Sequence, residues 1–133
     1  MSQSQSPLTS PLSKARGLGS AKDGTHHWLM QRITAILMAP LMMWFVYSVL
    51  TVMVGASRST AAEWFASPLN AIGLFALMMG MFYHSKLGLQ VVIEDYVHCT
   101  AMKSVLLVGL FIASYLLMII SAIAIVKLHV MGI

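Results

Sequence analysis

His84 is the side chain of this sequence best placed to do chemistry. It lies in a long, mostly apolar run over residues 69–93. An ionisable residue inside a membrane helix is costly and is by default a candidate functional residue. On a helix, Gly80 and Gly88 lie one turn before and after His84, and Gly73 lies three turns back. These glycines would leave the face that carries His84 flat.

The flat face around His84 has two interpretations, and the residues themselves leave both open. Close packing of another helix is one, with the imidazole hydrogen-bonded across the contact. Room for a planar macrocycle is the other, with the neutral imidazole supplying an axial bond to iron. Lys86 lies about 200° around the helix from His84, so we expect it outside this face, close enough to the inner interface to snorkel.

A polar cluster of Glu94, Asp95, Tyr96 and His98 follows where this run should leave the membrane. Asp95 comes eleven residues after His84, which puts it on the same face about 16 Å further along the helix. A carboxylate and a phenol below a histidine within the membrane suggest a vertical path. A hydrated polar loop is the alternative.

Arg32 opens the first apolar run, six residues after His26. An arginine at this place can simply serve the excess of positive charge on the inner side of a membrane. It can also pair through two hydrogen bonds with a buried carboxylate, such as a haem propionate or Asp95.

The elements that must position these residues follow from composition. The chain has 133 residues, of which 59% are hydrophobic and 9% charged, with a mean hydropathy of +0.83, so it is too apolar for a soluble globule. Residues 33–54, 69–93 and 104–126 form apolar runs that reach the roughly 20 residues a spanning helix needs. We predict an all-α membrane protein with helices at about residues 30–55, 69–96 and 103–128. The anchor domain spans residues 25–133, after a polar flexible tail over residues 1–24.

The basic residues predict the orientation of these helices. Those before and at the start of the first run are Lys14, Arg16, Lys22 and Arg32, whereas the segment 55–68 has only Arg58. The amino terminus is therefore expected inside, and the ends of the first two helices that carry the polar residues above meet on the inner side. Scattered basic residues in a chain of net charge +4 do not indicate nucleic acid, and the lone Cys99 excludes an internal disulfide.

Two segments carry a resemblance to a known family. They are G-T-H-H-W-L-M-Q-R-I-T-A-I at 24–36 and H-S-K-L-G-L-Q-V-V-I-E-D-Y-V at 84–97. In spacing they resemble the smaller of the two hydrophobic membrane anchor subunits of succinate dehydrogenase. His26 precedes Arg32 by six residues, and His84 is followed by Asp95 and Tyr96 after eleven and twelve. The sequence departs from the family at Leu29 and Met30, where a second aromatic residue is expected, and in its long polar tail.

The resemblance implies one component of succinate:quinone oxidoreductase, respiratory complex II, in which the tricarboxylic acid cycle meets electron transport. A flavoprotein subunit oxidises succinate, an iron–sulfur subunit relays electrons, and this chain packs with a second membrane anchor subunit, of the cytochrome b type, into a helix bundle around haem b. The two anchors reduce ubiquinone. The chain would be multi-pass in lipid of the cell inner membrane, with the mitochondrial inner membrane less favoured, and would catalyse nothing alone.

Carried over by position, the resemblance assigns roles to five residues. His84 looks like one axial ligand of the haem iron, with the other supplied by the partner anchor. His26 and Arg32 look like neighbours of the haem propionates. Tyr96 looks like a hydrogen-bond donor to a quinone carbonyl, with Asp95 beside it, and no residue is assigned as catalytic.

Other classes of membrane protein fit the sequence less well. A small subunit that transports protons or solutes would use His84 with Asp95 and Glu94 as relay groups. It predicts further ionisable groups deep in the spans, yet the first and third apolar runs hold no charge. A scaffold protein, in which His84 only bonds a neighbouring helix, would leave the matched spacings unexplained.

Overall fold

The structure, a computed structural model, describes residues 21–131, with side chains from Gly24 onward. Its helices are α2 (Ala21–Ser48), the short π-helix η1 (Val49–Met53), α3 (Arg58–Ala66), α4 (Pro68–Tyr96) and α5 (Thr100–Met131). Within these residues there is no strand. The predicted tail over residues 1–24 lies mostly outside the described part of the chain.

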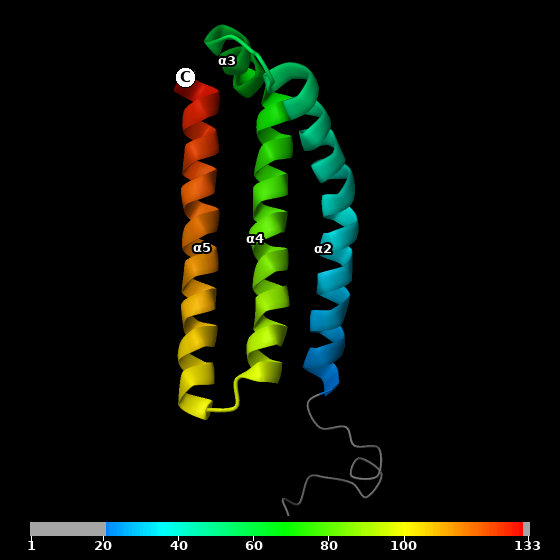
Figure 1. The fold of residues 1–133 in the computed structure, drawn as a ribbon, viewed down its shortest axis with the longest axis vertical. Coiled ribbons are helices and arrows are strands. Elements are labelled where there is room, and N and C mark those ends of the chain that lie inside the picture. The colour runs from blue at the N-terminus through cyan, green and yellow to red at the C-terminus, as the bar shows by residue number, and fades with distance from the viewer. Residues whose placement is uncertain (1–20, 132–133) are drawn as a thin grey trace, which may run out of the picture.

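Three helical stretches have the length and composition to cross a membrane. They are Gly24–Met53, Pro68–Tyr96 and Thr100–Met131. The prediction of an all-α protein with three transmembrane helices is therefore confirmed. The start of α2 and the end of α4 lie at the same end of the bundle, as predicted (Figure 1). We call this end the Tyr96 end and the opposite one the α3 end; that the Tyr96 end faces inside stays a prediction.

Helix bounds differ from the predicted ones where polar residues continue a helix. Helix α2 begins at Ala21, ahead of the predicted start near residue 30 and inside the predicted tail. Helix α5 covers Thr100–Met131, beyond the predicted 103–128 at both ends. Hydropathy marks the part of a helix that lies in lipid, whereas backbone hydrogen bonding continues into polar residues that lipid does not cover.

Helix α3 is an element that hydropathy did not reveal, because the segment 55–68 was expected to be a loop. The chain turns at Gly55, whose φ of +76° lies in the left-handed region that suits glycine. Ser57 then caps α3, since its side chain accepts a hydrogen bond from the Thr60 backbone N–H at 3.2 Å. Ser67 separates α3 from α4, which begins at Pro68, the helix position where a missing N–H costs least.

The three long helices stand in a row. Helix α4 lies between α2 and α5 (Figure 1), and the backbones of α2 and α5 do not come close to each other in the described part of the chain. The buried apolar side chains are accordingly few, and three of them, Leu74, Leu77 and Leu87, belong to α4. Most other large apolar side chains are exposed in the isolated chain, as expected when lipid or other membrane helices cover them.

The glycine face of α4 is where α2 packs. A Cβ built on Gly73 would lie 2.8 Å from Cη2 of Trp44, and one built on Gly80 would lie 3.3 Å from Cγ of Met38. One on Gly88 would lie 3.4 Å from Nε2 of the Gln31 side chain. Close helix packing, one of the two interpretations of the flat face, is therefore present along this contact.

Aromatic stacking holds the α3 end of the same contact. The rings of Trp44 and Trp64 stack with centroids 5.8 Å apart and planes 20° apart. Asn70 on α4 donates from Nδ2 to the Trp64 carbonyl oxygen at 2.9 Å. Trp44 thus packs against both Trp64 of α3 and the Gly73 position of α4, which fixes α2 against α4 at the α3 end.

Candidate functional site

A cavity of about 770 Å³ lies between the first half of α2 and the second half of α4. We call it the α2–α4 cavity, and its volume is within the range of about 300–1,000 Å³ that small-molecule sites occupy. Its polar and aromatic lining includes His26, His27, Trp28, Gln31 and Arg32 from α2, and Tyr83, His84, Gln90 and Glu94 from α4. A second cavity, of about 290 Å³, lies between α4 and α5 and is smaller.

His84 is half-buried and bonds across the contact between α4 and α2. Its Nδ1 lies 2.9 Å from the Thr34 hydroxyl oxygen. Its Nε2 lies 3.5 Å from Nε2 of Gln31, a long contact. The same Thr34 hydroxyl lies 2.8 Å from the carbonyl oxygen of Met30. The interhelical hydrogen bond expected under the close-packing interpretation is therefore present.

His26 and Arg32 line the same cavity as His84, so the structure brings these three predicted site residues together. Both α2 residues are exposed in the isolated chain. The guanidinium carbon of Arg32 lies 4.2 Å from the ring centroid of Trp28, within the range of a cation–π contact. The charge is therefore positioned at the cavity without a carboxylate among its described contacts.

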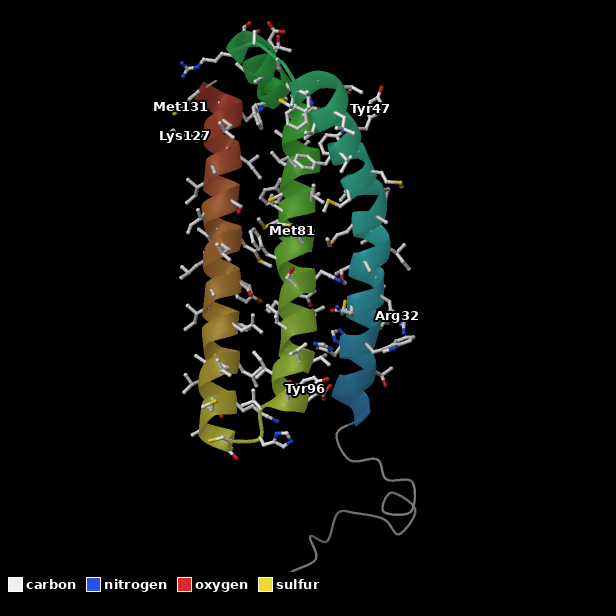
Figure 2. All side chains as sticks on the ribbon, viewed as in Figure 1. Arg32, Tyr47, Met81, Tyr96, Lys127 and Met131 are labelled. Atoms are coloured by element: carbon white, nitrogen blue, oxygen red, sulfur yellow. The ribbon has the colours of Figure 1, made fainter. Side chains whose placement is uncertain are left out.

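Asp95 and Tyr96 lie elsewhere. They are the last two residues of α4, both are exposed, and neither lines the α2–α4 cavity. The Tyr96 side chain is 77% exposed, and Figure 2 shows it at the end of α4, in the same half of the bundle as Arg32. The tertiary structure thus separates the predicted quinone residues from the residues around His84.

Glu94 is the acidic residue that does line the cavity. Its carboxylate accepts a hydrogen bond from Nε2 of Gln90 at 2.8 Å. Its backbone oxygen accepts one from Nζ of Lys103 at 2.7 Å. The bond from Lys103 ties the end of α4 to the start of α5, beside the exposed Tyr96.

Three polar residues of α2 were missed as site residues by sequence reasoning. His27 and Gln31 line the cavity, and His27 Nε2 and Gln31 Oε1 are buried without a hydrogen-bond partner. Thr34 contacts His84 directly. A signal was present, because positions 27, 31 and 34 follow the i, i+4, i+7 spacing of one helix face.

Lys86 does not snorkel toward the Tyr96 end, contrary to expectation. Its ammonium lies 4.8 Å from the ring centroid of Tyr83 and 5.2 Å from those of Phe111 and Tyr115. Side chains on a helix lean toward its start, and the three ring faces attract the cation. Lys86 lines a separate cavity of about 290 Å³ between α4 and α5, so its predicted place outside the His84 face is confirmed.

No group of three or more His, Cys, Asp or Glu side chains able to hold a metal ion occurs in the described part of the chain. A bare metal ion bound by protein ligands of this chain alone has no support there. A haem iron is different, because its equatorial ligands come from the macrocycle and a single imidazole is enough as an axial contribution.

Comparison with known proteins finds relatives over most of the chain. The family described as succinate dehydrogenase/fumarate reductase transmembrane subunit matches residues 6–126. The succinate dehydrogenase hydrophobic membrane anchor subunit of Rickettsia bellii (strain RML369-C) is 38% identical over 107 residues, which cover 77% of this chain and 82% of that protein. The subunit of the same name from Rickettsia conorii (strain ATCC VR-613 / Malish 7) is 36% identical over 95 residues, covering 71% and 75%. The succinate dehydrogenase membrane anchor subunit of Reclinomonas americana is 32% identical over 80 residues, covering 58% and 66%.

The resemblance seen in two short segments is thereby extended to the spans and the segments between them. The matched region contains the whole of α2, α3 and α4 and most of α5. With this coverage and three helices able to cross a membrane, the chain belongs to the family of succinate dehydrogenase and fumarate reductase transmembrane subunits.

Proposed function

We propose that this chain is a membrane anchor of succinate:quinone oxidoreductase that holds haem b through His84 and helps to reduce ubiquinone. The observation that carries the proposal is the α2–α4 cavity, which gathers three histidines and an arginine between two membrane helices. Relatives that share most of its length are named as succinate dehydrogenase membrane anchors.

The residues around His84 fit an axial ligand. Nδ1 has a close partner in Thr34 at 2.9 Å, whereas Nε2 has only the long 3.5 Å contact with Gln31. Gln31 is not held firmly at its other end, because its Oε1 is buried without a partner. Its side chain can turn away from Nε2 at little cost in hydrogen bonds and leave that nitrogen free to bind iron. Bound there, haem b would supply a one-electron carrier within the membrane.

The donors Arg32 and His26 at the cavity suit the propionate carboxylates of haem b. Arg32 and His26 are donors at the cavity edge near the start of α2, where propionates could reach water at the membrane surface. The Arg32 guanidinium is oriented by Trp28, so less freedom is lost when it binds a carboxylate.

Tyr96 and Asp95 are proposed to serve the quinone at the Tyr96 end. A quinone that is being reduced gains negative charge on its oxygens, so it needs donors where that charge develops. The Tyr96 phenol is 77% exposed in the isolated chain and is therefore available to a ligand held between this chain and another subunit. Asp95, next to it, could accept or deliver a proton through water.

The flat row of helices fits a chain that is one part of a larger assembly. Both outer helices expose large apolar side chains, and each has its backbone close to α4 alone among the long helices described. We propose that the second anchor subunit, with its own axial ligand, covers part of this surface and lipid covers the rest. The flavoprotein and iron–sulfur subunits would dock at the Tyr96 end, at the inner face of the cell inner membrane.

The experiment is a reduced-minus-oxidised optical spectrum of the complex purified through a tag on this chain. Wild type should show a b-type band, and His84→Ala should lose or strongly shift it while the partner subunits still copurify. The matched control is His98→Ala, because His98 is an exposed histidine outside the cavity lining. A wild type without haem and without a flavoprotein partner would refute the proposal.

The quinone part is tested separately. Tyr96→Phe should lower succinate-dependent quinone reduction while succinate oxidation by a soluble electron acceptor persists. Tyr47→Phe is the matched control, because Tyr47 is also exposed, at 67%, but lies toward the α3 end (Figure 2). Equal quinone reduction in both variants would remove Tyr96 from the quinone site.

A further inference from the structure

The Thr34 hydroxyl stands between His84 and the backbone of α2. Its oxygen lies 2.8 Å from the Met30 carbonyl oxygen and 3.1 Å from that of Gln31. It also lies 2.9 Å from Nδ1 of His84. A hydroxyl has one proton to donate, and carbonyl oxygens can only accept. If that proton goes to the backbone of α2, the Thr34 oxygen is left to accept from Nδ1–H of His84.

The second contact of His84 agrees with this arrangement. The amide nitrogen of Gln31, 3.5 Å from Nε2 of His84, is a donor and cannot accept. A neutral imidazole has one ring proton, so a ring that donates Nδ1–H to Thr34 carries none on Nε2. Both partners belong to α2, but Gln31 lines the α2–α4 cavity and Thr34 does not. Nε2, beside Gln31, is therefore on the cavity side of the ring, and Nδ1, beside Thr34, is on the side away from the cavity.

We infer that Thr34 is a positioning residue for His84, accepting a hydrogen bond from Nδ1–H and thereby holding Nε2 toward the α2–α4 cavity as the ligand atom. The inference rests on the proposed function, since it gives the His84 ring its metal-binding tautomer. A chain of two hydrogen bonds results, from His84 Nδ1–H to the Thr34 oxygen and from the Thr34 hydroxyl to the Met30 carbonyl oxygen.

The arrangement has two physical consequences for a bound iron. The ring cannot turn about its axis without losing the bond to Thr34, which α2 in turn holds in one rotamer through Met30. A ring that donates its other N–H is also a more basic ligand. Thr34 should therefore raise the affinity for haem and lower its reduction potential, since a stronger donor favours the oxidised iron.

The test compares Thr34→Val with Thr34→Ser in the purified complex. Valine keeps the shape of threonine and removes the hydroxyl, whereas serine keeps the hydroxyl. We expect Thr34→Val to weaken haem binding by roughly 10- to 100-fold and to shift the haem potential to more positive values. Thr34→Ser should restore the wild-type haem content, potential and low-spin EPR spectrum.

Thr51→Val is the matched control. Like Thr34, Thr51 donates its hydroxyl to the backbone carbonyl oxygen four residues before it, here that of Tyr47 at 2.8 Å. Unlike Thr34, it is exposed and has no described hydrogen bond to a histidine. Its loss should change neither haem content nor potential. If the Thr34→Val complex fails to assemble, Thr34→Ala is measured by EPR in unfractionated membranes, where an unaltered low-spin haem signal would overturn the inference.

The outcomes separate this inference from the proposed function. If wild type binds haem, His84→Ala loses it and Thr34→Val keeps the wild-type potential and spectrum, Thr34 is not a positioning residue while the proposed function stands. Equal shifts in Thr34→Val and Thr34→Ser would also overturn the inference, because the hydroxyl would not be their cause. Wild type without haem overturns both.

Discussion

Replacing Gly73 by alanine should strain the contact between α2 and α4 more than any other glycine substitution in the spans. The new methyl group would lie 2.8 Å from Cη2 of Trp44 and 3.0 Å from its Cζ3, so the indole must move. It cannot move freely, because its ring also stacks on the ring of Trp64, with centroids 5.8 Å apart. The displacement would therefore disturb α3 as well as α2.

The magnitude follows from two opposing terms. Overpacking a close contact costs typically about 1–3 kcal/mol, and alanine is better than glycine in a helix by about 0.8–1.0 kcal/mol. Gly73→Ala should thus change the free energy of unfolding by a net loss of about 0–2 kcal/mol. A methyl group at Gly109 would meet no atom within 4 Å, so Gly109→Ala should show only the stabilisation from the better helix propensity of alanine. The difference between the two variants isolates the cost of overpacking.

The other glycines of this face supply a graded series. At Gly80 the methyl group would meet the flexible Met38 side chain at 3.3 Å, and at Gly88 it would meet the Gln31 amide at 3.4 Å. We expect the loss to fall from Gly73→Ala through Gly80→Ala to Gly88→Ala. The assay is SDS titration in mild detergent, followed by tryptophan emission, which reports on the stacked Trp44. Equal stability of Gly73→Ala and Gly109→Ala would refute the reasoning that Trp44 is confined.

Three further substitutions test other contacts. Lys86→Met should change stability little in the same titration, because an ammonium within the bilayer costs about 2.5–3.5 kcal/mol and its three cation–π contacts, at about 0.5–1 kcal/mol each, offset most of that cost. A clear loss of stability would contradict this balance. Asn70→Ala removes the bond to the Trp64 carbonyl at 2.9 Å and should cost about 0.5–1.5 kcal/mol. Faster amide hydrogen exchange in α3 would accompany it, and unchanged exchange would contradict the assigned role. Ser57→Ala removes the cap on Thr60 N–H and should weaken α3 by about 0.5–2 kcal/mol, without altering exchange in α4.

The His84 site shows how two interpretations of one sequence pattern can be compatible. Glycines beside a membrane histidine predicted either close helix packing or space for a macrocycle. The structure has the close packing at Gly73, Gly80 and Gly88, and beside it a cavity of about 770 Å³ on which His84 opens. Close approach of α2 is also what brings Gln31 and Thr34 to the imidazole. Packing of the two helices and placement of a ligand atom therefore depend on the same face of α4.

Local features of the sequence were sufficient to predict the number of spans and to single out His84 as a candidate functional residue. A run of about 20 apolar residues must form a helix in lipid, since every backbone polar group there needs a partner within its own segment. An ionisable residue in such a run is conspicuous because a charge in lipid is costly. The alternating direction of successive spans also placed His26, Arg32 and Tyr96 at one end of the bundle, because the start of one span and the end of the next lie on the same side of the membrane.

Tertiary structure alone decided which residues meet at that end. It brought His26 and Arg32 into one cavity with His84 but left Asp95 and Tyr96 outside it, and it turned Lys86 toward aromatic rings of α5. It also selected Thr34 and Gln31 as the partners of His84. These contacts depend on how far one helix is rotated and shifted along another. Side-chain packing between segments distant in sequence sets that rotation and shift. Hydropathy is a sum over neighbours in the chain and therefore does not contain it.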